Sequence, residues 1–168
     1  MERDAHYWVE RLGLEEHPEG GFYRRTYQAD EAIPGECLPE RFGGARLLST
    51  AIYYLLPGGG FSAFHRIKSD EMWHFYAGVP LDLHMLDDGG VHSTVRLGRD
   101  FDRGEVFQAV VKAGVWFGAV VCDPESYSLV GCTVAPGFAF EDFELARRED
   151  LLARFPEHRE IVERLTRP

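Results

Sequence analysis

His65 and Glu71 lie six positions apart in the segment GFSAFHRIKSDEMWHFYAG, which spans residues 60–78. An imidazole and a carboxylate can transfer protons to and from a ligand, or they can bind a divalent metal. The surrounding aromatic residues predict a mostly apolar environment, in which both charges are tolerated mainly if the two groups share a hydrogen bond. Such a carboxylate fixes the imidazole tautomer and raises its basicity. We therefore interpret His65 as a candidate general base that Glu71 supports.

A tyrosine across the pocket is the expected acid for such a base. The sequence offers several and does not choose among them: Tyr23, Tyr27, Tyr53, Tyr54 and Tyr76. Arg24 and Tyr27 lie three positions apart, so a regular strand projects them from opposite faces, and one of them is expected at the mouth of the pocket. An arginine there would hold a carboxylate or phosphate of a ligand. The alternative is an exposed arginine on a strand that forms a dimer.

Large aromatic residues flank the polar pair, and they either fill the core or form stacking walls for a flat or sugar-like ligand. They are Phe64, Trp73, Phe75, Trp116 and Phe117. Together with Arg24, Tyr27 and Tyr54, they are the candidate ligand-binding residues. Strand alternation places Trp73 and Phe75 on the same face as Glu71, with His74 on the other face. His74 is therefore interpreted as a structural or subunit-contact residue.

The segment that carries these residues has the pattern of an antiparallel β protein. From Leu47 to Val134, short apolar or alternating runs are separated by turn signals such as PGGG, KSD, DDGG and DPES. This pattern is typical of a barrel or sandwich rather than of alternating strands and helices. Upstream, HPEGG breaks the chain and FYRRTYQ alternates as a half-buried strand does. Residues 30–46 contain prolines and glycines without a sustained period, which predicts a loop.

Both ends of the chain have helical spacing. Asp4 is a suitable N-cap for apolar residues spaced three and four apart, and Gly13 is suited to end that helix. In the tail, residues 141–168, two apolar stripes lie on either side of Pro156. The expected layout is a single domain of residues 1–168, with a barrel core at about 20–140 and helices at both ends.

Composition argues against several classes of partner. The formal net charge is −10, and the basic residues are not clustered, which argues against nucleic acid and anionic membranes as partners. Cys37, Cys122 and Cys132 have no metal-binding spacing and are predicted to be buried, reduced thiols. The first residues carry charges where a signal peptide needs an apolar core, and no apolar run approaches the roughly 18 residues of a membrane span. We expect a cytoplasmic protein.

Residues 60–78 resemble the first signature of the cupin superfamily, which runs from a glycine through two histidines and a glutamate to a second glycine. The residues in register are Gly60, His65, Glu71 and Gly78. Ile67 occupies the place of the second histidine. The stretch VVKAGVWFGAVV resembles the second signature, with Phe117 where its histidine stands.

A resemblance to one cupin branch, domain of unknown function 985, extends over nearly the whole chain. It is carried by HPEGGFYRRTYQ, STAIYYLLPGGGFSAFHRIKSDEMWHFYAG, AGVWFGA and SLVGCTVAPGFAFEDFELA. It implies a mainly β, single-domain double-stranded β-helix, the jelly-roll barrel of RmlC-like cupins, with one pocket for a small-molecule ligand. This branch is usually dimeric, and a homodimer formed through the N-terminal strand is expected, because exposed strand edges need covering.

In most cupins, the two histidines, the glutamate and the later histidine hold a divalent metal. Ile67 and Phe117 offer no lone pair, so only His65 and Glu71 remain of that set. Open catalytic metal sites usually keep three protein ligands. No cofactor is therefore predicted, and a divalent metal, if bound, would use His65 and Glu71. His74 or His84 would complete such a site only if a bulge turned it inward.

These observations favour a metal-independent isomerase or epimerase that acts at an acidic C–H bond of a small carbohydrate-like molecule. Metal-free cupins that epimerise deoxysugar nucleotides use a histidine supported by a carboxylate, with a tyrosine opposite, and the resemblance extends this arrangement to His65 and Glu71. A nucleotide sugar is not expected, because the sequence lacks the basic clusters that would hold a pyrophosphate. Two alternatives stay open: a ligand-binding or sensor module without turnover, and a metal-dependent cupin enzyme.

Overall fold

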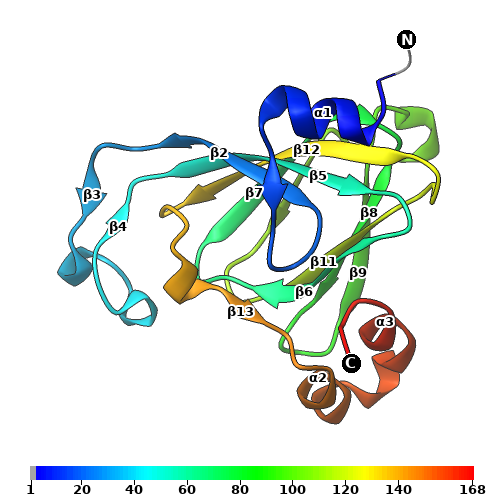
Figure 1. Ribbon diagram of the computed structural model, residues 1–168. Coiled ribbons are helices and arrows are strands. Elements are labelled where there is room, and N and C mark those ends of the chain that lie inside the picture. Colours follow the sequence, from blue (N-terminus) through cyan, green and yellow to red (C-terminus); the bar gives the residue numbers. More distant parts are fainter. Residues whose placement is uncertain (1–2) are drawn as a thin grey trace.

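The computed structural model describes residues 3–168 and consists mainly of two antiparallel β-sheets that face each other (Figure 1). The six-stranded sheet has the order β1 (Glu15–Glu16), β2 (Phe22–Gln28), β5 (Thr50–Pro57), β12 (Tyr127–Ala135), β7 (Asp70–Gly78) and β10 (Gln108–Val111). The five-stranded sheet has the order β13 (Glu144–Leu145), β6 (Phe61–Arg66), β11 (Trp116–Val121), β8 (Leu81–Leu86) and β9 (His92–Leu97). Residues 1 and 2 of the expected domain lie outside the described residues.

The remaining elements are short. Strands β3 (Ala32–Ile33) and β4 (Arg46–Leu47) form a separate pair. The α-helices are α1 (Ala5–Leu12), α2 (Arg148–Arg154) and α3 (Arg159–Arg164). The 3₁₀ helices are η1 (Gly35–Cys37), η2 (Glu40–Phe42), η3 (Phe101–Arg103), η4 (Phe140–Asp142) and η5 (Pro156–His158). The expected mainly β fold, with a short N-terminal helix and C-terminal helices, is confirmed.

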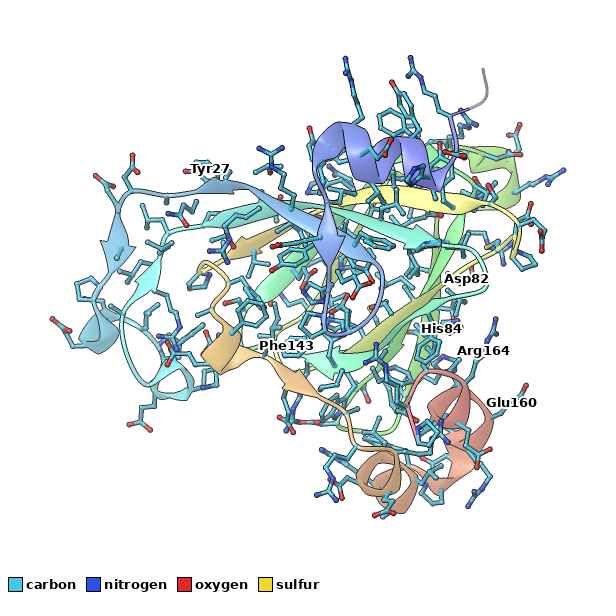
Figure 2. The ribbon with its side chains drawn as sticks, viewed as in Figure 1. Tyr27, Asp82, His84, Phe143, Glu160 and Arg164 are labelled. Carbon is cyan, nitrogen blue, oxygen red and sulfur yellow. The ribbon has the colours of Figure 1, made fainter. Side chains whose placement is uncertain are left out.

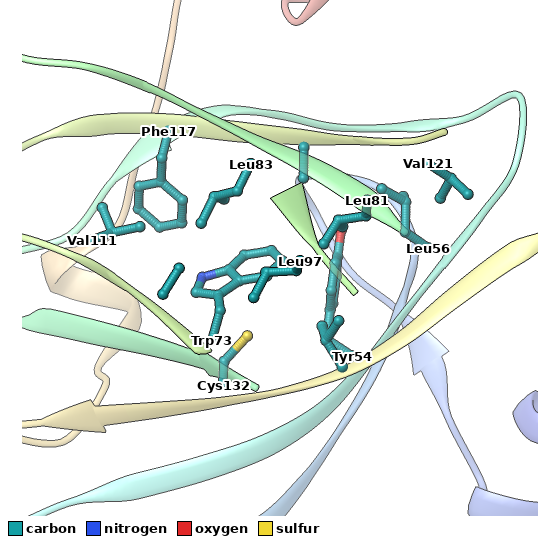
Figure 3. Close-up of a cluster of buried hydrophobic side chains, with 13 residues drawn as sticks. Tyr54, Leu56, Trp73, Leu81, Leu83, Leu97, Val111, Phe117, Val121 and Cys132 are labelled. Atoms are coloured by element: carbon teal, nitrogen blue, oxygen red, sulfur yellow. The ribbon is translucent and has the colours of Figure 1, made fainter. Parts of the chain in front are cut away.

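A cluster of buried apolar side chains fills the space between the two sheets (Figure 3). Trp73 from one sheet and Phe117 from the other are 1% and 0% exposed, and their rings meet edge to face at 6.3 Å. Burying a large apolar side chain stabilises a fold by about 1.5–3 kcal/mol. The interior at this level is therefore a packed core.

Helix α1 lies across the outer face of the six-stranded sheet (Figure 1). The side chain of Asp4 accepts a hydrogen bond from the backbone N–H of Tyr7 at 2.8 Å, and Gly13 ends the helix with φ +61°. The predicted N-cap and stop are thus confirmed. Trp8 donates from its indole to the Tyr127 hydroxyl at 2.8 Å, which attaches the helix to β12.

Helices α2 and α3 cover the outer face of the five-stranded sheet (Figure 1). Leu151 and Phe155 come from the first predicted stripe and Val162 from the second, and all three are at most 3% exposed. The stripes are thus confirmed as packing surfaces. Among residues 3–168, no helix is long and apolar enough to cross a membrane.

The prediction that all three cysteines are buried is only partly right. All three are free thiols, but only Cys132 is buried, whereas Cys37 and Cys122 are exposed. Cys37 ends η1 in the surface segment 30–46, and Cys122 follows β11 where the chain leaves its sheet. A cysteine at the end of an element does not need to face the core, and sequence patterns locate such ends poorly.

A buried ion pair anchors the segment between β12 and β13. The Arg46 guanidinium donates to both carboxylate oxygens of Asp142, at 2.6 and 2.7 Å, and to the Phe42 carbonyl at 2.6 Å. Arg46 and Asp142 are each 5% exposed. The predicted loop 30–46 is therefore fixed to the rest of the fold, because its last residue, Arg46, pairs with Asp142 of η4.

Asp142→Asn should lower the free energy of unfolding by about 3 kcal/mol, because it leaves the buried Arg46 charge with only the exposed carboxylate of Glu141, at 3.3 Å. The matched control is Glu144→Gln, which breaks the half-exposed pair between Glu144 and Arg66 and should cost at most about 1 kcal/mol. Chemical denaturation followed by fluorescence measures both. Equal losses in the two variants would contradict the anchoring role.

Candidate functional site

A buried cavity of about 40 Å³ lies where β5, β6, β7 and β12 meet the loop that precedes β2. Four titratable side chains with carboxyl or imidazole groups border it: His17, Glu19, His65 and Glu71. Glu19, His65 and Glu71 are 5%, 3% and 7% exposed. A space of this size holds about three water molecules. Several ionisable groups therefore share one small, mostly buried volume.

Both ring nitrogens of His65 are engaged. Nδ1 lies 2.7 Å from the carbonyl oxygen of Ala63, and Nε2 lies 2.9 Å from Oε2 of Glu19. Because a carbonyl oxygen only accepts, Nδ1 must donate and carry a proton. The proton between Nε2 and Glu19 then decides whether the pair is charged.

The predicted hydrogen bond between His65 and Glu71 is wrong, because Glu19 is the carboxylate that reaches the imidazole. Strands β6 and β7 belong to different sheets, so His65 and Glu71 face the cavity from opposite sides. No hydrogen bond or ion pair among the described residues joins them. Two residues that are close in sequence thus border one cavity without forming the expected pair.

The HPEGG motif places Glu19 against β6. The Ala63 N–H donates to the backbone carbonyl of Glu19 at 2.8 Å, and the Ser62 hydroxyl donates to Oε1 of its carboxylate at 2.8 Å. Gly20 has φ +113°, and a Cβ atom there would lie 2.3 Å from the Phe61 carbonyl oxygen. Only glycine allows this close approach of the two backbones. The motif therefore brings a carboxylate into the barrel, which its interpretation as a simple chain break missed.

Electrostatics favours the charged form of the His65–Glu19 pair. Burial by itself lowers the pKa of His65 and raises the pKa of Glu19. Their mutual attraction and hydrogen bond outweigh burial, so the net pKa of His65 is raised and that of Glu19 is lowered. These shifts favour the imidazolium form of His65, with one proton on each ring nitrogen.

His17 lies next to this pair but is neutral. Its Nδ1 is 3.5 Å from Oε2 of Glu19, close enough for an ion pair, yet the same nitrogen accepts a hydrogen bond from the Glu19 backbone N–H at 3.3 Å. A nitrogen that accepts carries no proton. Burial also lowers the pKa of His17, and it outweighs the attraction of Glu19. His65 therefore supplies the positive charge that balances Glu19.

Glu71 is the carboxyl group left without a charged partner at hydrogen-bond distance. Burial raises its pKa from 4.5 to about 7, and the nearby Glu19 carboxylate adds to the rise while His65 opposes it. The neighbouring Cys132 stays a thiol, because burial raises its pKa well above the usual value. At neutral pH, Glu71 is therefore present in both protonation states.

Tyr54 is the tyrosine that borders the cavity. Its hydroxyl donates to the Gly20 carbonyl at 2.8 Å, and burial raises its pKa well above 10. Of the other four candidates, Tyr53 and Tyr76 pair with each other, at a centroid distance of 6.0 Å, and Tyr27 is 53% exposed. Tyr23 packs edge to face on His17 at 4.7 Å.

The structure separates the five aromatic candidates into two groups. Phe117 lies against His65, with ring centroids 4.0 Å apart, and Trp73 and Phe75 pack in or against the interior cluster. Phe64 and Trp116 instead pack against helices α2 and α3, outside the barrel. The expectation that Phe64 and Trp116 border the pocket is therefore wrong. Neighbouring residues of a strand point to opposite faces, so Phe64 points away from the face of His65 and Trp116 away from the face of Phe117.

Arg24 and Tyr27 do not reach the cavity, which corrects the expectation that one of them lies at its mouth. Both are exposed on β2, and Arg24 donates to the Leu12 carbonyl at the end of α1 at 2.9 Å. A β-bulge between Arg25 and Tyr27 interrupts the alternation on which the expectation rested. Figure 2 shows Tyr27 at the far end of β2, toward β3.

The family model described as Cupin superfamily (DUF985) matches residues 6–146. The chain is a cupin of the DUF985 family. Protein SO0799 from Shewanella oneidensis has a solved structure similar to this cupin, with a TM-score of 0.90, 42% identity, and coverage of 100% of this chain and 99% of that one. A hypothetical protein from Leishmania major has a TM-score of 0.89 and 33% identity, covering 98% and 99% of the two chains. The uncharacterized protein YML079W of Saccharomyces cerevisiae is 32% identical over 149 residues, which are 83% of this chain and 73% of that protein.

The residues of this cupin do not fit the metal that the superfamily signature implies. Ile67 borders the cavity where the signature has a histidine, and Phe117 packs against His65 at a tilted angle where it has another. Both nitrogens of His65 are already engaged. His74 contacts Thr133 and Gln108, and His84 contacts His92, so neither turns into the cavity. Among residues 3–168, no group of three or more His, Cys, Asp or Glu side chains is arranged to hold a metal ion.

Glu71→Gln should change how the stability of this cupin depends on pH. Since the folded-state pKa of Glu71 is raised, the folded protein binds more protons than the unfolded chain between pH 4.5 and about 7, and stability falls as pH rises through that window. The wild type should therefore lose up to about 3 kcal/mol relative to Glu71→Gln between pH 4.5 and 8. Urea denaturation across this range measures the difference.

The matched control for this measurement is Glu125→Gln, which replaces an exposed carboxylate far from the cavity. It should keep the pH profile of the wild type. Parallel profiles for the wild type and Glu71→Gln would show that Glu71 titrates as an ordinary carboxyl group.

Proposed function

We propose that this cupin is a metal-independent isomerase or epimerase that moves a proton at an acidic C–H bond of a small carbohydrate-like ligand. Glu71 takes the proton from carbon, and the electron pair moves onto the adjacent carbonyl oxygen to give an enolate. After this intermediate turns in the site, Glu71 returns the proton to the opposite face of the same carbon while the carbonyl re-forms, which inverts that carbon. The His65 imidazolium stabilises the negative charge through its field. The proton-transfer role thus belongs to Glu71, and His65 is a positioning and electrostatic residue.

The contrast between two carboxyl groups beside one cavity supports this proposal most strongly. Glu19 is ion-paired to His65 and hydrogen-bonded to Ser62, so it stays ionised. Glu71 lacks such partners, and its pKa is about 7. A general base works best when its pKa is near the working pH, because it can then both take and release a proton.

His65 is less suited to act as the base, for a geometric reason. To accept a proton from carbon, one of its nitrogens would have to be free, and each already donates, one to Ala63 and one to Glu19. Neutral Tyr54 borders the same cavity, but its hydroxyl already donates to the Gly20 carbonyl at 2.8 Å, so it forms part of the cavity wall without a free proton to donate.

Binding without turnover is the second candidate function. The cavity of about 40 Å³ is smaller than any sugar, which favours a protein that holds part of a ligand without rearranging it. A ligand recovered unchanged after long incubation would identify this case.

The homodimer stays a prediction. Strand β1 pairs only with Phe22 and Tyr23 of β2, so the rest of that strand, Arg24–Gln28, has an outer edge that no other strand of the described chain covers. Such an edge is suited to pairing with a second copy.

The proposed reaction should exchange a substrate hydrogen for solvent deuterium. Glu71→Gln should lower the exchange rate at least about 100-fold, and the wild-type rate should rise with pH through about 7 as Glu71 ionises. Proton NMR of neutral and acidic carbonyl sugars in D₂O measures the exchange.

Glu125→Gln is the control for exchange and should match the wild type, since its carboxylate is exposed and remote. Exchange that persists in Glu71→Gln would remove Glu71 from the reaction. A wild type that exchanges no carbonyl sugar would contradict the proposed function as a whole.

A further inference from the structure

An open groove of about 410 Å³ lies directly outside the buried cavity. The groove and the cavity share two lining residues, Ile67 and Phe143, so the two spaces are separated only by these side chains. Phe143 lies on the segment between η4 and β13 (Figure 2), and its ring is 5.3 Å from that of His65. Phe143 therefore forms a wall between the groove and the ionisable cluster.

The volumes of the cavity and the groove imply that most of a ligand would lie in the groove. The cavity of about 40 Å³ has room for about three waters, whereas pockets for small molecules measure about 300–1,000 Å³. The groove of about 410 Å³ falls in that range. A ligand whose reacting end lies beside Glu71 would thus extend past Phe143 into the groove.

The fold gathers cations at this groove that are dispersed in the sequence. Arg41, Arg66 and Lys68 line it, and so do three carboxylates on the facing segment. Arg66 pairs with Glu144 at 2.7 Å. The buried Arg46 donates two hydrogen bonds to Asp142, and its positive charge neutralises that carboxylate.

Arg41 and Lys68 are the cations with capacity to bind a further anion. Arg41 is exposed, donates through Nε to the Lys68 carbonyl at 2.8 Å, and forms no ion pair among residues 3–168. Lys68 is 3.4 Å from Asp142, whose charge Arg46 already satisfies. The guanidinium nitrogens of Arg41 that do not contact Lys68 suit a carboxylate or phosphate oxygen.

We propose that the groove binds the anionic group of a small ligand, a carboxylate or phosphate, through Arg41 and Lys68, while the neutral end of the ligand passes Phe143 toward Glu71. For the reaction at the neutral end of the ligand, this proposal rests on the proposed function. The cavity holds two carboxyl groups against one imidazolium, so it repels an anion. The groove has three cations and three carboxylates, but the buried Arg46 pairs with Glu141 and Asp142, which leaves Arg41 and Lys68 for an anion. The two spaces together fix the direction in which the ligand lies.

Isothermal titration with glucose, glucuronate and glucose 6-phosphate tests this, because the three share a sugar ring and differ in charge. At low salt, at least one anionic sugar should bind the wild type with a Kd below about 10 mM, and about 0.5 M salt should weaken it, whereas glucose should bind more weakly than either. The two anions distinguish a carboxylate from a phosphate site. Inorganic phosphate tests whether the anion alone suffices.

The double variant Arg41→Gln, Lys68→Gln should raise the Kd of the anionic sugar about tenfold or more and leave that of glucose unchanged. Both side chains are at the surface, so the fold should persist. Arg25→Gln, which removes an exposed arginine of β2 away from the groove, should bind as the wild type does.

Three outcomes would overturn the proposal: no anionic sugar binds, glucose binds as tightly as the anions, or the double variant keeps wild-type affinity. Glu71→Gln separates this proposal from the function on which it rests. It should abolish deuterium exchange but keep anion binding, since Glu71 does not line the groove. Anion binding without any exchange would therefore reject the proposed reaction and retain the groove as a binding site.

Discussion

Glu19 and His65 place two opposite charges inside the barrel, where each isolated charge costs several kcal/mol to bury. The pair is tolerated because further partners complete it: Ser62 donates to the carboxylate, and the Ala63 carbonyl accepts from the imidazolium. These two partners are neighbours on β6, so the pair also attaches the loop before β2 to that strand. A single electrostatic contact thus closes one side of the cavity and fixes the protonation of His65.

This pairing determines the chemistry available to Glu71. The one positive charge in the cavity is engaged by Glu19, so an ionised Glu71 meets both a low dielectric and a second negative charge. Its pKa of about 7 is the consequence. Two carboxyl groups in one cavity therefore have different roles, and their surroundings rather than their chemical type assign those roles. In the groove outside the cavity, Arg41 and Lys68 can bind a further anion, which gives the proposed ligand a direction.

The fold and part of the site could be predicted from the sequence, because alternation and turn residues encode strands directly. That His65 and Glu71 border one cavity follows from a motif that fits the cupin family. The partner of His65 could not be predicted, because Glu19 lies 46 positions away in the chain and reaches it only through the close backbone approach that Gly20 allows. Residue type alone predicts both Trp116 and Phe117 at the pocket, whereas strand alternation turns Trp116 to the outer face of its sheet.

The protonation of His65 tests this account most directly. Nitrogen-15 NMR of the histidine-labelled protein, with His65→Gln to assign the signals, shows how many protons the ring carries. We predict that both nitrogens of His65 show a directly bonded proton at pH 7, because the pKa of His65 is raised above the usual value of histidine by the buried Glu19 carboxylate. A ring with a single protonated nitrogen at pH 7 would contradict the buried ion pair and the roles derived from it.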